Sequence, residues 1–115
     1  MSSLRMTLQT QLVLRALLED PAGQRYGLEL CELAGLPSGT IYPILARLEQ
    51  AGWLDSTWED PAVHERAGRP RRRFYRITQD GAEQARLALA RAYRARKKPL
   101  PGWAAARPAG EGGVA

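Results

Sequence analysis

Apolar residues recur at helical spacing in three stretches of the first half of the chain, which predicts three helices. The stretches run from Thr7 to Glu19, from about Arg25 to Ala34 and from Ser38 to Gln50. Thr7 is expected to cap the first helix and Ser38 the third, because hydroxyl oxygens accept from backbone amides of the first turn. The residues expected to face inward are Leu8, Leu12, Val13, Leu17 and Leu18, then Leu28, Leu30, Cys31 and Leu33, and finally Ile41, Ile44, Leu45 and Leu48.

A short turn separates the second predicted helix from the third. It consists of Gly35, Leu36 and Pro37, and Gly35 stands where a left-handed residue would end the second helix. Two helices joined by a glycine-containing turn of about three or four residues are typical of a helix-turn-helix.

The pattern then changes from helical spacing to alternation. Residues Trp53 to Glu59 and Arg72 to Ile77 each alternate, which predicts two strands of a hairpin. Between them, Asp60 to Arg71 is polar and contains proline and glycine, so it is expected to be a loop. A helix-turn-helix followed by a hairpin is the order of a winged helix, in which the loop is the wing.

A last helix is expected to begin at Thr78 and to continue to about Lys97, a length of roughly 30 Å at 1.5 Å per residue. A helix of that length cannot pack along its whole extent against one small domain, so we expect part of it to form a dimer interface. The predicted interface residues are Ala82, Ala85, Leu89 and Ala92, with Tyr93 alongside.

The predicted fold is therefore mainly α with a β-hairpin, a winged helix-turn-helix with a long C-terminal dimerisation helix. Residues 1–77 are expected to form the DNA-binding domain and residues 78–98 the dimerisation helix. Residues 99–115 are rich in proline, glycine and alanine, and we expect them to be a disordered tail.

Charge supports a nucleic-acid partner through its distribution more than through its net value of +5. Between Arg66 and Arg76 there are six arginines and no acidic residue. A charge run is most often a solvated surface, but arginines on a wing suit phosphate contacts and a narrow minor groove. Alternation places Arg72 and Phe74 on one face and Arg73 and Tyr75 on the other. The wing residues predicted to contact DNA are Arg69, Arg71, Arg72 and Arg73.

The third helix is the expected recognition helix, which would lie in the major groove. Its face opposite the apolar stripe carries hydroxyls and one arginine but few strong base-reading side chains, so the wing is expected to supplement it. Pro43 lies deeper than the first turn and is expected to bend the start of this helix. The residues predicted to contact DNA here are Ser38, Gly39, Thr40, Tyr42, Pro43 and Arg47.

These segments resemble the PadR family of bacterial regulators. The similarity is carried by Gly39 to Leu45 (GTIYPIL), Arg47 to Glu49 and Tyr75 to Thr78 (YRIT), and it covers about Thr7 to Leu89. It implies a winged helix-turn-helix, a dimer formed through the terminal helix, and operator binding as a repressor. The resemblance is to the smaller branch of the family, which has a single C-terminal dimer helix and no separate C-terminal domain.

In some relatives aromatic residues between the domain and the dimer helix line a ligand pocket. Here Tyr26, Trp53 and Trp58 are interpreted as packing residues, and no particular small-molecule effector is indicated.

Other functions find little support in the residues. The single histidine and single cysteine, His64 and Cys31, are far apart in the expected fold, so neither a metal site nor a Cys–His nucleophile pair is indicated, and no cofactor or enzyme activity is predicted. No apolar run reaches the ~18 residues of a membrane span, and no signal peptide is visible. We therefore expect a cytoplasmic protein that binds double-stranded DNA as a homodimer. The alternative is a winged helix that contacts a protein or RNA.

Overall fold

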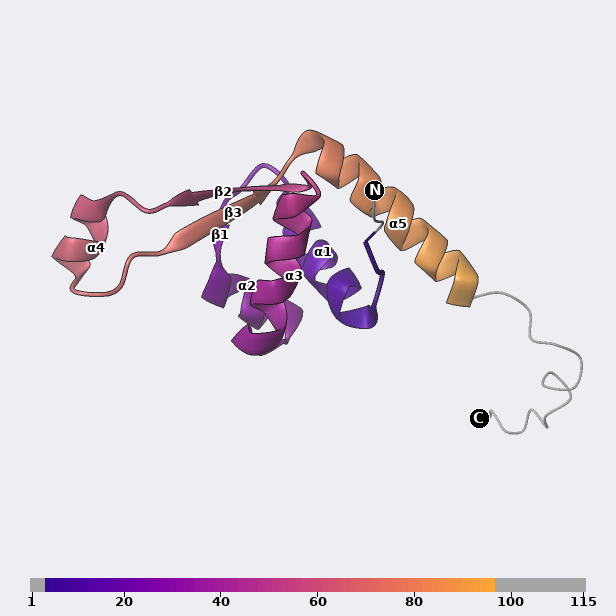
Figure 1. The fold of residues 1–115 in the computed structure, drawn as a ribbon, viewed down its shortest axis with the longest axis horizontal. Coiled ribbons are helices and arrows are strands. Elements are labelled where there is room, and N and C mark those ends of the chain that lie inside the picture. The colour runs from indigo at the N-terminus through magenta and orange to yellow at the C-terminus, as the bar shows by residue number, and fades with distance from the viewer. Residues whose placement is uncertain (1–3, 97–115) are drawn as a thin grey trace, which may run out of the picture.

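The computed structural model describes residues 4–96 and has the architecture of a winged helix-turn-helix with a long last helix (Figure 1), so the predicted fold class is confirmed. The predicted tail and the end of the predicted dimerisation helix lie outside the described residues, and the domain boundaries stay a prediction. The elements are α1 (Leu8–Leu18), β1 (Arg25–Tyr26), α2 (Gly27–Ala34), α3 (Ser38–Gln50), β2 (Leu54–Trp58), α4 (Pro61–Ala67), β3 (Arg73–Ile77) and α5 (Gln79–Arg96).

The core lies where α1, α2 and α3 pack together beneath the sheet. All four predicted inward residues of α3 are buried, and they meet Val13 and Leu14 of α1 and Leu30 of α2. Burial of such aliphatic side chains is the main favourable contribution to folding. The amphipathic pattern of α3 therefore predicted its orientation correctly.

The predicted inward sets of α1 and α2 were wrong in part. Leu8, Leu28 and Leu33 are exposed, whereas Leu14 is fully buried. In the eight-residue α2, Leu30 and Ala34 lie one helical turn apart and form the buried face, so the other leucines must point elsewhere. A pattern rich in leucine does not decide between such faces in so short a helix.

The predicted capping residues Thr7 and Gly35 are confirmed, whereas the prediction that Ser38 caps α3 was wrong. The Thr7 hydroxyl accepts from the amide of Thr10 at 3.2 Å, and Gly35 ends α2 with φ of 70°. Residue Pro37, and not Ser38, precedes the first turn of α3, where its carbonyl accepts from Thr40 and Ile41 at 3.0 Å each. Ser38 is thus the first helical residue, and it lies at the exposed tip of α3.

The hairpin of β2 and β3 gains a third strand, β1, which the sequence did not predict because two residues are too short to show alternation. The sheet order is β1-β3-β2 and both pairings are antiparallel, with Leu54 opposite Ile77 and Trp58 opposite Arg73. This register places Leu54 and Ile77 on the face that covers the helical core, where both are buried.

The wing is longer and more ordered than a polar loop. The prediction of a loop over Asp60 to Arg71 was wrong in part, because residues Pro61–Ala67 form the helix α4 at the tip (Figure 1). The Asp60 carboxylate accepts from the amide of Ala62 at 2.9 Å, proline occupies the first turn and Gly68 ends the helix. None of the residues of α4 is buried.

The start of α5 is joined to the end of α3 by a compact set of contacts. The carbonyl of Trp53 accepts from the Thr78 amide at 2.9 Å, and the Thr78 hydroxyl donates to the carbonyl of Gly52 at 3.1 Å while accepting from the amide of Gly81 at 2.8 Å. A Cβ at Gly81 would overlap the carbonyl oxygen of Trp53. Only a glycine lets α5 begin so close to this turn.

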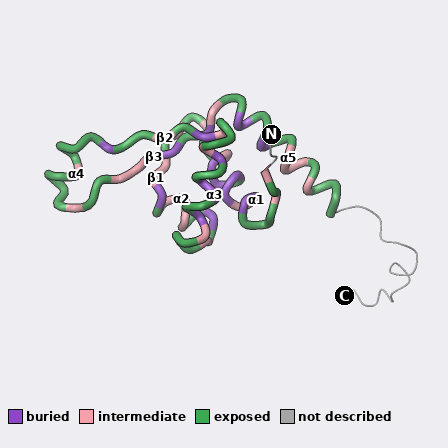
Figure 2. Tube along the Cα trace, in the orientation of Figure 1, coloured by how far each residue is buried: buried purple, intermediate pink, exposed green. Residues whose placement is uncertain are grey.

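From this start α5 projects away from the core, and its outer half is largely exposed (Figure 2). Ala82 and Ala85 in its first turns are buried within the chain itself. No helix within residues 4–96 is long and apolar enough to cross a bilayer.

Gly81→Ala is expected to lower the free energy of unfolding by about 1–3 kcal/mol, because the added methyl forces α5 away from the backbone of Trp53. Gly39→Ala is the matched control, since nothing lies within 4 Å of its Cβ position. That variant should be neutral or gain up to about 1 kcal/mol from the better helix former. Urea unfolding followed by circular dichroism measures both, and equal stabilities would contradict the close approach.

Candidate nucleic-acid interface

The exposed face of α3 is uncovered along its whole length. At three- and four-residue spacing, Gly39, Pro43, Ala46 and Gln50 form the line opposite the buried stripe, and all four are exposed. Ala46 and Gln50 were not among the predicted contacts, although the same helical spacing could have found them. Gln50 is the one side chain of this line with hydrogen-bonding groups. The line can therefore make few hydrogen bonds to the edges of DNA bases.

The start of α3 is suited to an anion. Its first turn contains no acidic residue, and Ser38 and Gly39 are exposed there. Free backbone amides and the helix dipole make such an end favourable for a phosphate. α3 continues through Pro43 as one helix, and because proline has no N–H, the carbonyl of Gly39 lacks its usual partner four residues on.

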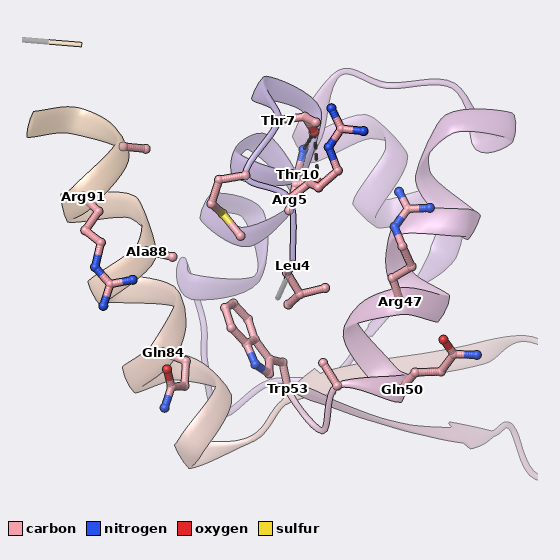
Figure 3. A pocket seen from close by; sticks show the side chains of 13 residues that line it. Leu4, Arg5, Thr7, Thr10, Arg47, Gln50, Trp53, Gln84, Ala88 and Arg91 are labelled. Atoms are coloured by element: carbon pink, nitrogen blue, oxygen red, sulfur yellow. Dashed lines mark hydrogen bonds between the residues drawn. The ribbon is translucent and has the colours of Figure 1, made fainter. Parts of the chain in front are cut away.

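Tyr42 and Arg47 leave this face on opposite flanks. The Tyr42 hydroxyl lies against Gly27, where a Cβ would overlap it, so the ring packs at the start of α2. Burial there raises the pKa of the phenol. On the other flank Arg47 lines a groove together with Arg5 and Gln50 (Figure 3). Tyr42 therefore helps to orient α3 against α2, and Arg47 lies on the flank of α3 that borders the groove.

Glu59 organises the base of the wing. It is buried at the end of β2, and its carboxylate receives two hydrogen bonds of 2.7 Å from the Arg69 guanidinium and one of 3.2 Å from the amide of Arg72. The hydrogen bonds from Arg69 are the largest reason why the pKa of Glu59 falls to about 2. Arg69, predicted as a DNA contact, is thus bound to Glu59 within the wing.

The remaining predicted wing arginines are divided between the two faces of the hairpin, as alternation indicates. Arg73 donates to the Ser56 hydroxyl at 2.7 Å and lies 3.5 Å from the carboxylate of Glu49 in α3. Arg72 covers the ring of Tyr26 on the opposite face, with its guanidinium carbon 4.1 Å from the ring centroid. Arg73 therefore contacts β2 and α3, whereas Arg72 contacts Tyr26 on the other face.

Arg71 is exposed, and its Nε donates to the backbone carbonyl of Glu59 at 2.7 Å. This bond uses only Nε, and the terminal amino groups of Arg71 make no hydrogen bond within the described part of the chain. Arg71 and Arg72 are the two predicted wing arginines that form no ion pair within the described residues.

A groove of about 1180 Å³ lies between the N-terminal segment, the end of α3 and α5 (Figure 3). Three arginines and no acidic residue are among the described residues that line it. Trp53, interpreted from the sequence as a packing residue, forms part of its wall. The lining is Leu4, Arg5, Met6, Thr7, Thr10, Arg47, Gln50, Ala51, Trp53, Gln84, Ala88, Arg91 and Ala92.

The five residues predicted for the dimer interface differ in accessibility. Ala82 and Ala85 belong to the chain's own core, while Leu89 and Ala92 are half-buried and Tyr93 is exposed. Leu87, which the stripe omitted, is a large apolar side chain with 55% of its surface exposed. A partner could therefore meet the outer part of α5 and not its first turns.

The exposed recognition helix, the arginine hairpin beside it and the projecting last helix define a winged helix-turn-helix DNA-binding protein. The sequence matches the profile described as the transcriptional regulator PadR-like family over residues 13–87. That match spans more than half of the chain, so the protein belongs to this family. No curated protein sequence matches it.

Solved structures of transcriptional regulators have a similar fold. A PadR family transcriptional regulator from Eggerthella lenta DSM 2243 is 27% identical, with a TM-score of 0.60 over 78% of this chain and 80% of that chain. The PcaV transcriptional regulator from Streptomyces coelicolor, solved in complex with its natural ligand, is 28% identical, with a TM-score of 0.60 over 92% and 71%.

A PadR family transcription regulator from Clostridium difficile R20291 is 21% identical, with a TM-score of 0.62 over 79% of this chain and 93% of that chain. At this identity the likeness concerns the fold alone. Family and fold together identify the protein as a transcriptional regulator that binds DNA.

The Glu59 carboxyl is expected to titrate with a pKa of about 2, and Arg69→Ala should return that pKa toward its ordinary value of 4.5. Because the folded pKa is the lower one, the stabilisation of the wing is complete above pH 4.5 and is lost as the pH falls toward 2. Carbon-13 NMR of the glutamate carboxyls measures both values. A Glu59 pKa that Arg69→Ala leaves unchanged would refute the pairing.

Proposed function

We propose that the protein represses transcription by binding an inverted-repeat operator as a homodimer. The observation that supports this most is the acid-free, exposed start of α3, on a helix whose other end contacts, through Glu49, the hairpin that carries Arg71 and Arg73. A helix in the major groove with an arginine-bearing wing beside it is the way a winged helix-turn-helix contacts a duplex.

The residues at the start of α3 suit two kinds of contact. Ser38 and Thr40 carry hydroxyls that can bond phosphates or base edges, and Gly39 and Pro43 allow the helix to approach the groove closely. Gln50 can read adenine through paired hydrogen bonds if the groove brings a base to the far end of the helix. Since strong base-reading side chains are few, we assign a substantial share of specificity to the shape of the operator.

The proposed partner for the projecting end of α5 is a second copy of this chain. Leu87 is exposed on the helix, and the adjoining groove is walled by Trp53 and the alanines Ala88 and Ala92. An exposed apolar strip on a projecting helix is typical of a subunit interface, and two-fold symmetry is the commonest arrangement. A two-fold dimer presents two copies of α3, and these require an inverted repeat.

Repression is the simplest consequence of such a complex. A dimer seated on an operator that overlaps a promoter excludes the polymerase by occupying the DNA, without further contacts to the transcription machinery.

Selection of bound duplexes from random DNA is expected to recover an inverted repeat whose half-sites are one helical turn apart, about 10 base pairs centre to centre. Affinity for that site should fall steeply with salt, with a logarithmic slope of about −0.9 for each phosphate contacted. Placed at a promoter, the site should lower reporter expression when the protein is present. Recovery of no preferred site, or of an asymmetric one, would contradict operator binding by a dimer.

Leu87→Glu is expected to convert the dimer into a monomer in sedimentation equilibrium, because two carboxylates would be buried at the two-fold contact. Leu28→Glu in α2 is the matched control, since Leu28 is a leucine of similar exposure, 60% against 55%, on another helix. The control should stay dimeric. A dimer that survives Leu87→Glu, or one that Leu28→Glu dissociates, would show that the subunits meet elsewhere.

A further inference from the structure

Trp58, interpreted from the sequence as a packing residue, is not packed in the core. It is the last residue of β2, and 53% of its surface is exposed. The guanidinium carbons of Arg71 and Arg73 lie 5.7 and 5.0 Å from the centroid of its ring, within the range of cation–π contacts. The wing therefore presents a large aromatic surface bordered by two positive charges.

The surroundings of Trp58 are held in place by hydrogen bonds. Arg73 donates to the Ser56 hydroxyl, and Ser56 in turn donates to the carboxylate of Glu49 in α3 at 2.6 Å. Arg71 is bound to the backbone of Glu59 on the other side. Because these bonds fix the two arginines, the indole is positioned before any ligand arrives, which lowers the entropy lost on binding.

The side of the hairpin that carries Trp58 is the side of α3. The register places Trp58 opposite Arg73 and Ser56 opposite Tyr75, so these side chains share one face. Ser56 contacts Glu49 of α3 on that face, and Trp58 lies two residues further out, toward the tip of the wing. A duplex seated against the exposed side of α3 would meet this part of the hairpin next.

The other aromatic residues of the sheet have different surroundings. Tyr26 and Phe74 meet edge to face with centroids 6.1 Å apart on the opposite face, beneath Arg72. Tyr26 and Phe74 cover part of each other's surface, whereas the ring of Trp58 contacts the two arginines and is otherwise exposed to solvent. Among the described residues its indole N–H donates to no acceptor.

We propose that Trp58 contacts DNA. Its indole packs against deoxyriboses in the groove next to the one that α3 occupies, and Arg71 binds the adjoining phosphate. This inference rests on the proposed DNA-binding function and assigns a further residue to it. An aromatic face suits the apolar atoms of the sugar, and contacts with the sugar carry no direct sequence information. Trp58 then contributes affinity and not readout.

The binding experiment uses duplex DNA carrying the site recovered by selection. Trp58→Ala is expected to weaken binding about tenfold, the size expected for loss of one large apolar side chain from an interface, without changing the salt slope. Arg71→Ala should lower the magnitude of the slope by about 0.9, because one phosphate contact is lost. Thr57→Ala, on the opposite face of the same strand, is the control and should bind as the unmodified protein does.

Two results would overturn the proposal. One is an unchanged affinity in Trp58→Ala. The other is a lowered salt slope in Trp58→Ala, which would show that Trp58 acts only by positioning the arginines.

A second measurement leaves the wing intact. Protein labelled with 5-fluorotryptophan contains three reporters, Trp53, Trp58 and Trp103. The fluorine signal of Trp58 is identified by its absence in Trp58→Phe. It is expected to shift when the duplex is added, and an unshifted signal at saturating DNA overturns the inference. If the unmodified protein binds no duplex, the proposed function fails, and that outcome is distinct from binding that leaves Trp58 unaffected.

Discussion

Three functional parts of this protein depend on one backbone turn. The carbonyl of Trp53, just after α3, accepts from Thr78, just after β3, and lies against Gly81 at the start of α5. The end of the recognition helix, both ends of the hairpin and the origin of the last helix therefore meet within a few ångströms. Because the backbone of this turn is hydrogen-bonded and Gly81 leaves no space between it and α5, the relative orientation of these elements is well defined.

The inward face of α3 and the pairing of the two hairpin strands could be predicted from the sequence, because local spacing decides them. In α3 the apolar residues fit a single face, and all four are buried. In α2 leucines occupy both sides of a short helix, so only the tertiary contacts decide that Leu30 is inside. The helix α4 could have been found from its capping residues, Asp60, Pro61 and Gly68, but it has no apolar stripe and periodicity does not reveal it.

The candidate interface was less predictable, because the state of an arginine depends on partners that are distant in sequence. Glu59 is ten residues from Arg69, and Glu49 is twenty-four residues from Arg73. A run without acidic residues thus acquired two acidic partners on folding. The interpretation of Trp58 as a packing residue failed for a related reason: an aromatic residue at the end of a strand is buried only if another element covers it.

The ion pair between Glu59 and Arg69 also separates the tip of the wing from the folding of the rest. Residues 60–68 lie beyond it, and none of them is buried. Substitutions, insertions or deletions there remove no core contacts and leave the base of the hairpin closed. The sequence of the tip can therefore change at little cost to the stability of the domain, because no buried residue and neither partner of the ion pair lies within it.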